Sequence, residues 1–481
     1  MVVVEARWRL SLQPTSRFRP NRPKGSVDSI IRMLLVFRLR VEARAGPKGR
    51  AGSYSRRTAK CRDSVFSRAG IRTERVRKRN LLALIISQSM KSDRGLRACI
   101  STPEIQKKIR ALKPCKLLQE LVSIASSSGD EYRAACFVEN YLLRHGIRVR
   151  RQQVQSNRFN LVASIGRRTR RPHILFNTHI DTVPAFARKA LCPSLRGGLL
   201  YGRGACDAKG NVAAMAAAFL ALAQQPLRDR PHLTLAIMVG EENSGDGVAR
   251  FTRSYRDFNW AVVGEPTGLG IARTQSGYME LEIEVFSSPC HGFDPISEQS
   301  AVALAALVRD CREMVNDLSR QYPHSLFVRS FAGGGDDSFW YTRPYCRARL
   351  LFNPFPDSTQ RAVIDGVRRL ARRIEHLYSG TRIKATVVDA DNGLTTSKRS
   401  QSVRALCSGL RAIGEKPAFP HLPSWTDGST LNDVGIETVI FGPGDLKNAH
   451  TNAECVPILE VEKAALVLAL ACMNQQPKDS E

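Results

Sequence analysis

Apolar runs of strand length alternate with helical segments between residues 158 and 240. RFNLVASIG (158–166), PHILFNTHI (172–180) and HLTLAIMVG (232–240) have apolar cores, and the Ala-rich stretch 210–225 predicts a helix between the last two. Strands with continuous apolar cores occur where helices cover both faces of a sheet. The alternation therefore predicts an α/β domain with a largely buried, mixed sheet and helices on both faces.

A helix is expected just before the first strand. Residues 128–147 carry Ser128 three positions before Glu131, which is the pattern of a capping box. Apolar residues at helical spacing follow, and Gly146 supplies a stop. Ordered structure is expected to begin near residue 103.

The pattern changes after residue 272. GYMELEIEVFSS (277–288) alternates polar and apolar residues, as an antiparallel strand with one exposed face does. The segments that follow complete the order βαββαβ and lie near 298–318, 326–332, 345–352, 358–378 and 381–390. We expect a small α+β domain at 273–390, inserted between the two parts of the first domain at 103–272 and 391–481.

Positive charge is concentrated before the first domain. The chain of 481 residues has a formal charge of +29, and residues 1–110 carry 28 Lys and Arg against seven Asp and Glu. Such a segment could bind nucleic acid or an anionic membrane, or direct the chain to an organelle. Because it lacks sustained helical periodicity, we favour a disordered tail or a mis-assigned start for residues 1–102, with Met90 as the candidate true start.

Neither a membrane span nor a disulfide framework is expected. The apolar stretches 30–37 and 81–86 are far shorter than the ~20 residues that cross a bilayer. The twelve cysteines contain no C-x-x-C pair and no regular spacing, which disfavours disulfide scaffolds and structural zinc clusters. Reduced thiols fit a cytoplasmic protein.

Histidine and acidic residues follow the predicted strands. The stretch NTHIDTVP (177–184) ends one of them. In open α/β sheets ligands bind beyond the carboxyl ends of the strands, so residues at several strand ends can meet at one site. The candidates for such a site are His179, Asp181, Asp207, Glu241, Glu242, Glu265 and His450.

This residue set suits a pair of divalent metal ions. Imidazoles and carboxylates without cysteine favour a hard or borderline ion such as zinc, cobalt or manganese. Two ions about 3.5–4 Å apart need a bridging carboxylate and roughly two more ligands each, and they activate water for hydrolysis. Two acids are left over, of which one could act as a general base and the other could hold a ligating imidazole in place.

Each element alone has a simpler interpretation. A histidine at a strand end is more often a hydrogen-bonded boundary residue, and paired glutamates are usually a solvated loop. Gly202 and Gly204 could form only a tight turn, because Asp207 replaces the third glycine of a dinucleotide fingerprint. The absence of G-x-S-x-G and Walker A motifs disfavours serine hydrolases and NTPases. The joint occurrence of five such elements carries the hypothesis.

Five motifs together resemble one enzyme family. HIDTVP, GRGACDAKG, GEENSGDG, GEPT and GPGDLKNAHTNAECVPI are similar, in order and spacing, to the metal-dependent aminoacylase and carboxypeptidase family. That family includes acetylornithine deacetylase, succinyl-diaminopimelate desuccinylase and enzymes of the carboxypeptidase G type. The resemblance covers residues 107–481 and is nearest to the acetylornithine and acetylcitrulline deacetylase branch. The segment before residue 103 has no counterpart in the family.

The resemblance implies a metal ligand set. His179 and Glu265 would bind one ion, Glu242 and His450 would bind the other, and Asp207 would bridge the two.

It also implies three catalytic roles. Glu241 would be the general base and later the proton donor to the leaving amine, and Asp181 would orient the metal-binding histidine. His291 in the inserted domain would stabilise the oxyanion, often across the interface of a homodimer formed by this domain. A surface histidine is an equal interpretation of His291.

The family's substrate-binding positions are altered. By ungapped placement, Tyr341 and Asn353 stand where the family has an Asn and a carboxylate-binding Arg. Arg343, Arg347 or Arg349 could bind the substrate carboxylate instead, or the substrate could lack one there.

The predicted function is that of a two-metal amidohydrolase of arginine biosynthesis. It would remove an acyl group, acetyl in the simplest case, from an amino acid such as ornithine or citrulline. A dipeptidase, carboxypeptidase or desuccinylase with the same site is an alternative. A non-catalytic metal-binding protein whose basic tail holds nucleic acid is another, but the intact ligand set disfavours it, and neither nucleic acid nor membrane is an expected partner.

Overall fold

The computed structural model describes residues 101–167, 172–185, 188–291, 299–319, 325–336, 339–354 and 359–473. The expectations for the basic segment, including the start at Met90, lie outside these residues, apart from positions 101 and 102. The described chain opens with α3 (Thr102–Ala111), close to the expected onset of order.

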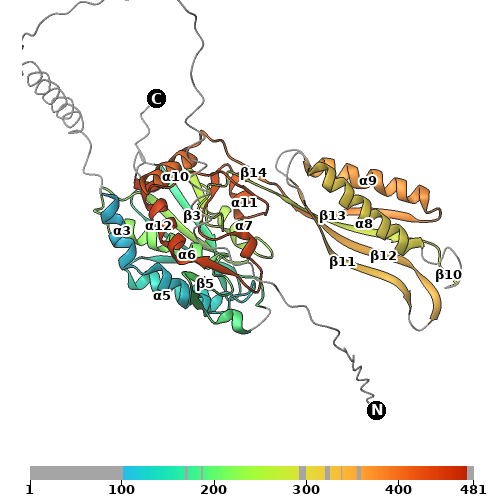
Figure 1. The fold of residues 1–481 in the computed structure, drawn as a ribbon, viewed down its shortest axis with the longest axis horizontal. Coiled ribbons are helices and arrows are strands. Elements are labelled where there is room, and N and C mark those ends of the chain that lie inside the picture. The colour runs from blue at the N-terminus through green and yellow to red at the C-terminus, as the bar shows by residue number, and fades with distance from the viewer. Residues whose placement is uncertain are drawn as a thin grey trace, which may run out of the picture. The chain divides into compact units, whose positions relative to one another are not determined.

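A six-stranded mixed sheet forms the centre of the first domain, which is called the catalytic domain below (Figure 1). Four neighbouring strands run parallel, and at one edge two further strands are added by antiparallel pairing. Their order across the sheet is β1 (Val149–Gln155), β2 (Arg158–Ile165), β6 (His232–Met238), β3 (His173–His179), β7 (Trp260–Val263) and β16 (Glu437–Ile440). The expected apolar runs thus form strands, and the chain after the inserted domain returns to the sheet as β16.

Helices cover both faces of this sheet. Because side chains alternate along a strand, Ile174 and Phe176 of β3 lie in one apolar core and Leu175 lies in the other. The first core is covered by α4 (Pro114–Val122), α5 (Tyr132–Arg144), α6 (Lys209–Ala223), α10 (Gln401–Ala412) and α12 (Ile458–Met473), together with α3. The second is covered by α7 (Asp246–Thr252) and α11 (Asp427–Asp433). These two layers confirm the predicted α/β architecture.

Helix α5 is shorter than expected, and its predicted capping box is wrong. Gly146 follows the helix with a φ of +76°, as the stop signal requires. Ser128, however, donates a hydrogen bond to Asp181 at 2.7 Å, and the Glu131 carboxylate binds Arg158. Both side chains therefore make long-range contacts in place of the capping-box contacts, and Glu131 also accepts the backbone N–H of Gly129.

The inserted domain has the predicted βαββαβ order. Its antiparallel sheet runs β13–β9–β12–β11, and α8 and α9 pack on one face around Leu281, Ile283 and Leu350. The elements are β9 (Tyr278–Phe286), α8 (Gln299–Leu318), β11 (Ser325–Asp336), β12 (Phe339–Asn353), α9 (Thr359–Leu377) and β13 (Arg382–Asp391). A short β10 (Cys290–His291) extends β9 along β12.

Two small sheets complete the description. The chain enters the inserted domain after β8 (Thr274–Gln275) and leaves it before β14 (Leu394–Thr395). Strand β8 pairs with β14 on one side and with β15 (His421–Leu422) on the other. The second sheet contains β4 (Ser194–Arg196), β5 (Leu199–Tyr201) and β17 (Cys455–Pro457). Two short 3₁₀ helices are η2 (Arg188–Leu191) and η3 (Leu446–Asn448).

Disulfides and membrane-spanning helices can be assessed for the described residues. Their ten cysteines form no disulfide. Among them, no helix combines the length and the apolar content that a membrane span requires.

Candidate metal centre

The candidate ligands gather at the carboxyl ends of neighbouring parallel strands. His179 is the last residue of β3, Glu241 and Glu242 follow β6, and Glu265 follows β7. Because β6, β3 and β7 are adjacent and parallel, these positions share one edge of the sheet. Asp207 reaches the same edge from the turn before α6.

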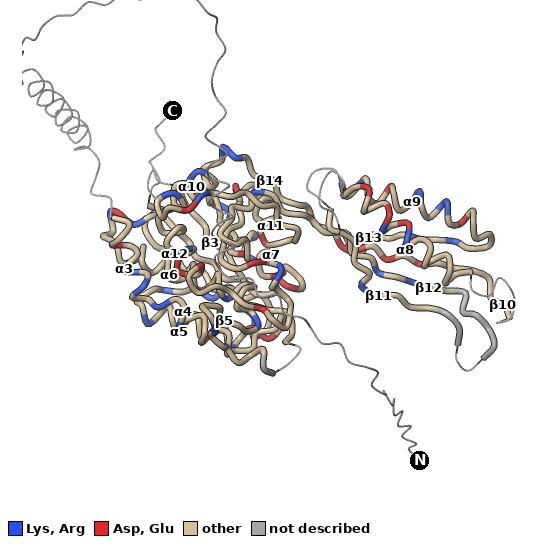
Figure 2. Tube along the Cα trace, viewed as in Figure 1, with Lys and Arg blue, Asp and Glu red and all other residues tan. Residues whose placement is uncertain are grey.

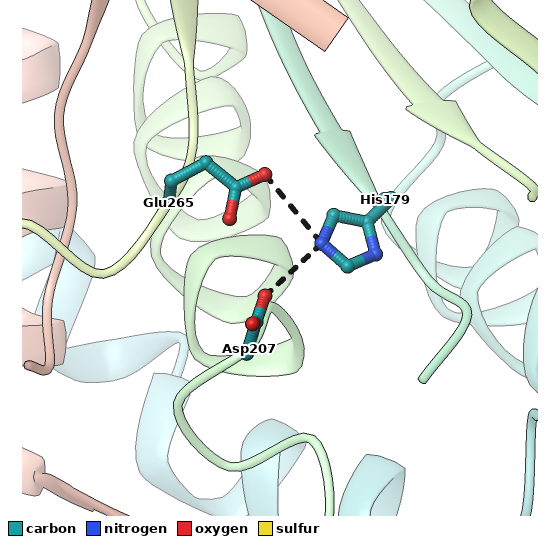
Figure 3. A group of neighbouring side chains, drawn as sticks. All are labelled: His179, Asp207 and Glu265. Atoms are coloured by element: carbon teal, nitrogen blue, oxygen red, sulfur yellow. Dashed lines mark hydrogen bonds and ion pairs between the residues drawn. The ribbon is translucent and has the colours of Figure 1, made fainter. Parts of the chain in front are cut away.

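His179, Asp207 and Glu265 form one group that could hold a metal ion (Figure 3). The Nε2 atom of His179 lies 3.2 Å from Oδ1 of Asp207 and 3.5 Å from Oε1 of Glu265. All three residues are buried. One imidazole nitrogen and two carboxylate oxygens therefore converge from three separate segments of the chain.

His450 completes a second group with Glu242 and the same aspartate. Its Nε2 atom lies 2.9 Å from Oε2 of Glu242 and 3.3 Å from Oδ2 of Asp207. Asp207 thus turns one carboxylate oxygen to each histidine, which is the arrangement expected of a bridging ligand. His450 takes a left-handed backbone conformation, with a φ of +61°, a region in which histidine is enriched among non-glycine residues.

The centre carries more negative charge than its own side chains can balance. Among the described residues, the ion-pair partners of its four metal-facing acids, Asp207, Glu241, Glu242 and Glu265, are histidines only. Burial is the largest cause that raises the pKa of Glu265, to about 8, and the nearby carboxylates of Asp207 and Glu242 add to it.

The negative charge of the carboxylates raises the pKa values of both histidines. Burial alone would lower the pKa of His179, but the carboxylates around it, led by Glu265, raise it well above its ordinary value. Hydrogen bonds to Asp207 and Glu242 raise the pKa of His450 to about 10. The carboxylates thus favour positive charge next to them, which two divalent ions would also supply.

These residues fit a pair of divalent ions. The donor set contains imidazole and carboxylate groups, which zinc and other borderline ions prefer. The Oε1 atom of Glu242 is buried without a hydrogen-bond partner among the described residues, and a cation would satisfy it. The structure therefore brings the five predicted ligands together in two groups that share the aspartate.

Glu241 lies beside both groups without belonging to either. Its Oε2 atom is 3.9 Å from Nε2 of His179, and its side chain is only 9% exposed. Burial raises the pKa of Glu241 well above its ordinary value, and the carboxylates of Glu265 and Asp427 add to this effect. Such a group can accept a proton and return it, which suits the predicted role of general base.

Asp181 supports the centre from behind in two ways. Its Oδ1 atom lies 3.4 Å from Nδ1 of His179, and its backbone carbonyl is 3.1 Å from the same nitrogen. The carboxylate also accepts the backbone N–H groups of Glu241 and Glu242, at 3.1 and 3.0 Å. Asp181 therefore positions the acidic loop as well as the imidazole of His179. The sequence analysis expected only the contact with the imidazole.

Arg158 is a supporting residue that the sequence analysis missed. Its guanidinium makes two hydrogen bonds of 2.9 Å to the buried Glu131 and one of 2.6 Å to Asp246, the first residue of α7. This ion pair closes the loop that begins at Gly240, where φ is +75° and a Cβ atom would meet both Asp246 and Arg158. An arginine at the start of an otherwise apolar strand was the available signal.

Glu454 was missed as well. Its buried carboxylate accepts the backbone N–H groups of Cys206 and Asp207, at 3.1 and 3.2 Å, and binds Arg203 at 2.6 Å. It thereby ties the His450 loop to the turn that carries the bridging aspartate. Its place four residues after a candidate ligand was the only sequence signal.

A pocket of about 200 Å³ opens over the centre. Asp207, Glu241, Glu242, Glu265 and His450 form its polar wall. The rest of its lining is mostly apolar and includes Leu422, Pro423, Trp425 and Leu446.

The inserted-domain candidates are not part of either ligand group. His291 is an exposed residue of β10, and its predicted role as oxyanion stabiliser stays a prediction. Arg349 lies 3.4 Å from Glu282 and 3.6 Å from Glu280, so its guanidinium is engaged within the inserted sheet. The side chains of Tyr341 and Arg343 lie outside the description.

The chain is similar in sequence to one protein family and to several known proteins. The model of peptidase family M20/M25/M40 matches residues 175–474. The chain is 25% identical over 367 residues to the LysW-lysine/LysW-ornithine hydrolase of Sulfurisphaera tokodaii, covering 74% of this chain and 94% of that one. It is 28% identical over 303 residues to acetylornithine deacetylase of Myxococcus xanthus, covering 61% and 77%. A probable carboxypeptidase of Aspergillus clavatus is 29% identical over 252 residues, which are 50% of this chain and 60% of the relative.

Solved structures share the fold. Human carnosine dipeptidase 1 superposes with a TM-score of 0.64 at 16% identity, covering 77% of this chain and 98% of that one. A dinuclear metal-binding peptidase from Bacillus subtilis gives a TM-score of 0.59 at 14% identity, with 76% and 98% covered. At these identities the similarity shows the architecture alone.

Proposed function

The chain belongs to peptidase family M20/M25/M40, whose members are metal-dependent hydrolases of amides and peptides, and we propose that it removes an acyl group from the α-nitrogen of an amino acid. Acetyl is the simplest such group, and ornithine or citrulline is the proposed amino acid. The observation that carries the proposal is Asp207, which faces one histidine with each oxygen while Glu241 stands beside the pair. The similarity to acetylornithine deacetylase supports the choice of substrate.

Two divalent ions held by His179, Glu265, Glu242, His450 and the bridging Asp207 would polarise the amide carbonyl and lower the pKa of a water molecule at the site. Zinc is the proposed ion, with cobalt or manganese as alternatives, because no thiolate takes part and two imidazoles do.

Glu241 moves the proton in this scheme. Its carboxylate accepts a proton from the attacking water as the new C–O bond forms. It then delivers that proton to the amide nitrogen as the C–N bond breaks, so that a carboxylate and an amine leave. Asp181 contributes by fixing the positions of the backbone of this glutamate and of the ring of His179.

A second candidate is hydrolysis of dipeptides or of C-terminal residues by the same centre. The name of the Aspergillus clavatus relative, a probable carboxypeptidase, supports it. Both reactions break a linear amide, so the described centre serves either. The groups that hold the two ends of the substrate would distinguish them.

Three further features belong to the proposal. We propose a homodimer through the inserted domain, because its edge strand β11 exposes Phe327 and Phe331 by 57% and 50%. His291 would then reach the centre of the partner subunit. A cytoplasmic location, with a role in arginine biosynthesis, accords with the reduced cysteines among the described residues.

The test is a substrate panel. The purified chain would be incubated with N-acetyl amino acids, N-succinyl amino acids and dipeptides, with and without a chelator. Chelator-sensitive release of acetate from N-acetylornithine or N-acetylcitrulline, faster than cleavage of any dipeptide, is the expected result. A preference for dipeptides would replace the first candidate by the second, and metal binding without hydrolysis of any member would contradict both.

A further inference from the structure

A second, larger cavity adjoins the metal pocket on the catalytic domain. Its volume is about 760 Å³, within the range of small-molecule sites. Its wall is formed largely by apolar side chains, which include Leu199, Pro266, Pro420, Leu422, Leu446 and Pro457. None of these residues belongs to the ligand set of the metal centre.

The cavity and the metal pocket share part of their walls. Leu422, Pro423 and Leu446 line both. Pro266, which lines the large cavity, directly follows the ligand Glu265. A molecule whose amide lies at the metal centre therefore has an apolar space beside it.

The acidic and imidazole groups of the cavity wall are already engaged. Oδ1 of Asp445 accepts the backbone N–H of Lys447 at 3.0 Å, and Oε2 of Glu460 accepts the N–H of Gly444 at 2.9 Å. The ring nitrogens of His421 lie 3.0 and 3.1 Å from the hydroxyls of Ser276 and Thr274. Apart from Lys447 and Asn448, the wall thus offers a guest mainly hydrocarbon surface.

We propose that this cavity binds the acyl chain of the substrate, and that the preferred acyl group is apolar and longer than acetyl. The inference rests on the proposed function. In an N-acyl amino acid, the amine half carries a carboxylate and, in ornithine or citrulline, a polar side chain. Only the acyl half can be wholly hydrocarbon, and so it is the half that gains by leaving water for an apolar wall.

The size of the effect follows from the burial of methylene groups. Each buried methylene strengthens binding about fourfold. Replacing acetyl by hexanoyl adds four methylenes, and with incomplete burial this raises kcat/KM by roughly tenfold to a hundredfold. A site made for acetyl alone would show a flat or falling series.

Leu199 offers a way to change the cavity without touching the metal pocket. It lies on β5, lines only the larger cavity of the two, and is half-buried. Leu199→Trp would occupy part of the space, and Leu199→Asp would place a charge in it. Leu195→Asp is the matched control, because Leu195 lies on the adjacent strand β4 of the same small sheet and is 51% exposed.

The experiment measures kcat/KM for N-acetyl, N-hexanoyl and N-decanoyl forms of one amino acid with the metal-loaded full chain. We expect a rise with chain length in the wild type and in Leu195→Asp. Both Leu199 variants should lose about tenfold on the hexanoyl substrate and stay within about twofold on the acetyl substrate. Melting temperatures close to the wild type would show that the variants fold.

Three outcomes would overturn the inference: a flat or falling series in the wild type, a rise that survives in both Leu199 variants, or an equal loss on all three substrates. If no amide is hydrolysed, the proposed function fails and the cavity is tested by calorimetry with decanoyl-ornithine. Binding by the wild type and by Leu195→Asp, but not by Leu199→Asp, would then support the apolar site, and no binding at all would overturn it.

Discussion

The metal centre and the inserted domain differ in the charged groups that lie next to their acidic side chains. In the inserted sheet, Glu280 lies 2.8 Å from Arg329 and Glu284 lies 3.1 Å from Lys384, and Figure 2 shows acidic and basic residues interspersed along α8 and α9. At the centre, the acids are buried and meet only histidines among the described residues. The inserted domain therefore supplies its own countercharges, whereas the centre depends on added cations.

The largest difference between the two regions should be in the turnover that remains after one acidic side chain is removed. Glu241→Ala should keep two metal ions per chain and lose turnover by about 10³-fold, because the proton carrier is gone while the ligands remain. Glu284→Ala, in the inserted sheet, is the matched control and should retain most of the activity. Metal analysis and initial rates would measure both, and substantial turnover by Glu241→Ala would remove that residue from the mechanism.

Removing a buried cation comes next in size. Arg158→Met should destabilise the fold by about 3–5 kcal/mol, because it leaves the fully buried Glu131 without its partner. Urea unfolding of the metal-loaded chain would give the free energy. A loss under about 1 kcal/mol would mean that the buried pair is no stronger than a surface one.

Loss of the metals should make stability depend on pH. In the metal-free chain, burial raises the pKa of Glu265 to about 8 and that of Asp427 to about 7, and hydrogen bonds raise the pKa of His450 to about 10. All three folded values exceed the unfolded ones, so the folded chain binds more protons and its stability falls as pH rises. The two acids lower the stability as the pH rises from about 4 to 8, and His450 does so from about pH 6.5 to 10.

We expect the metal-free chain to lose on the order of 2 kcal/mol between pH 5 and 9, and saturating zinc or manganese to remove most of this slope. Thermal unfolding across this pH range, with and without metal, measures it. A metal-free chain that gains stability toward pH 9 would show that the centre does not carry an excess of buried carboxylates.

A smaller effect should follow from the loss of one supporting hydroxyl. Ser128→Ala removes the 2.7 Å hydrogen bond to Asp181 and should lower metal affinity by about tenfold, with a stability loss of about 1.5 kcal/mol. Ser123→Ala is the control, because that exposed hydroxyl bonds only to the carbonyl of Glu120 three residues earlier. Equal metal affinities in the two variants would reduce Ser128 to a structural contact.

The smallest effect is expected in the inserted sheet. Lys384→Met removes the partner of Glu284 from an exposed pair and should change stability by less than about 1 kcal/mol, and less still in high salt. Like Arg158→Met, this variant replaces the basic residue of an ion pair by methionine, but the pair is exposed. If both variants lost the same stability, burial would not be what separates the two regions.

The ligand types and their places at strand ends could be predicted because each signal is local. An apolar run followed by His179 or Glu265 contains both the strand and the polar residue that ends it. The period of two also predicted correctly the alternation in the second half of β9, where Ile283 and Val285 are buried and Glu282 and Glu284 are half-buried. The βαββαβ order of the inserted domain followed from the same kind of local pattern.

The sequence by itself thus determined the fold class, the order of the elements and the inventory of metal-binding groups. The residues alone left the pairing of these groups open, and the family resemblance implied one. The tertiary structure brings the groups together in space, since Asp207 and His450 are 243 positions apart in the chain and meet at 3.3 Å. It also assigned Ser128 and Glu131 to Asp181 and Arg158 in place of a helix cap. The physical reason is that a buried polar group must find a partner wherever the fold brings one, and no local pattern records that partner.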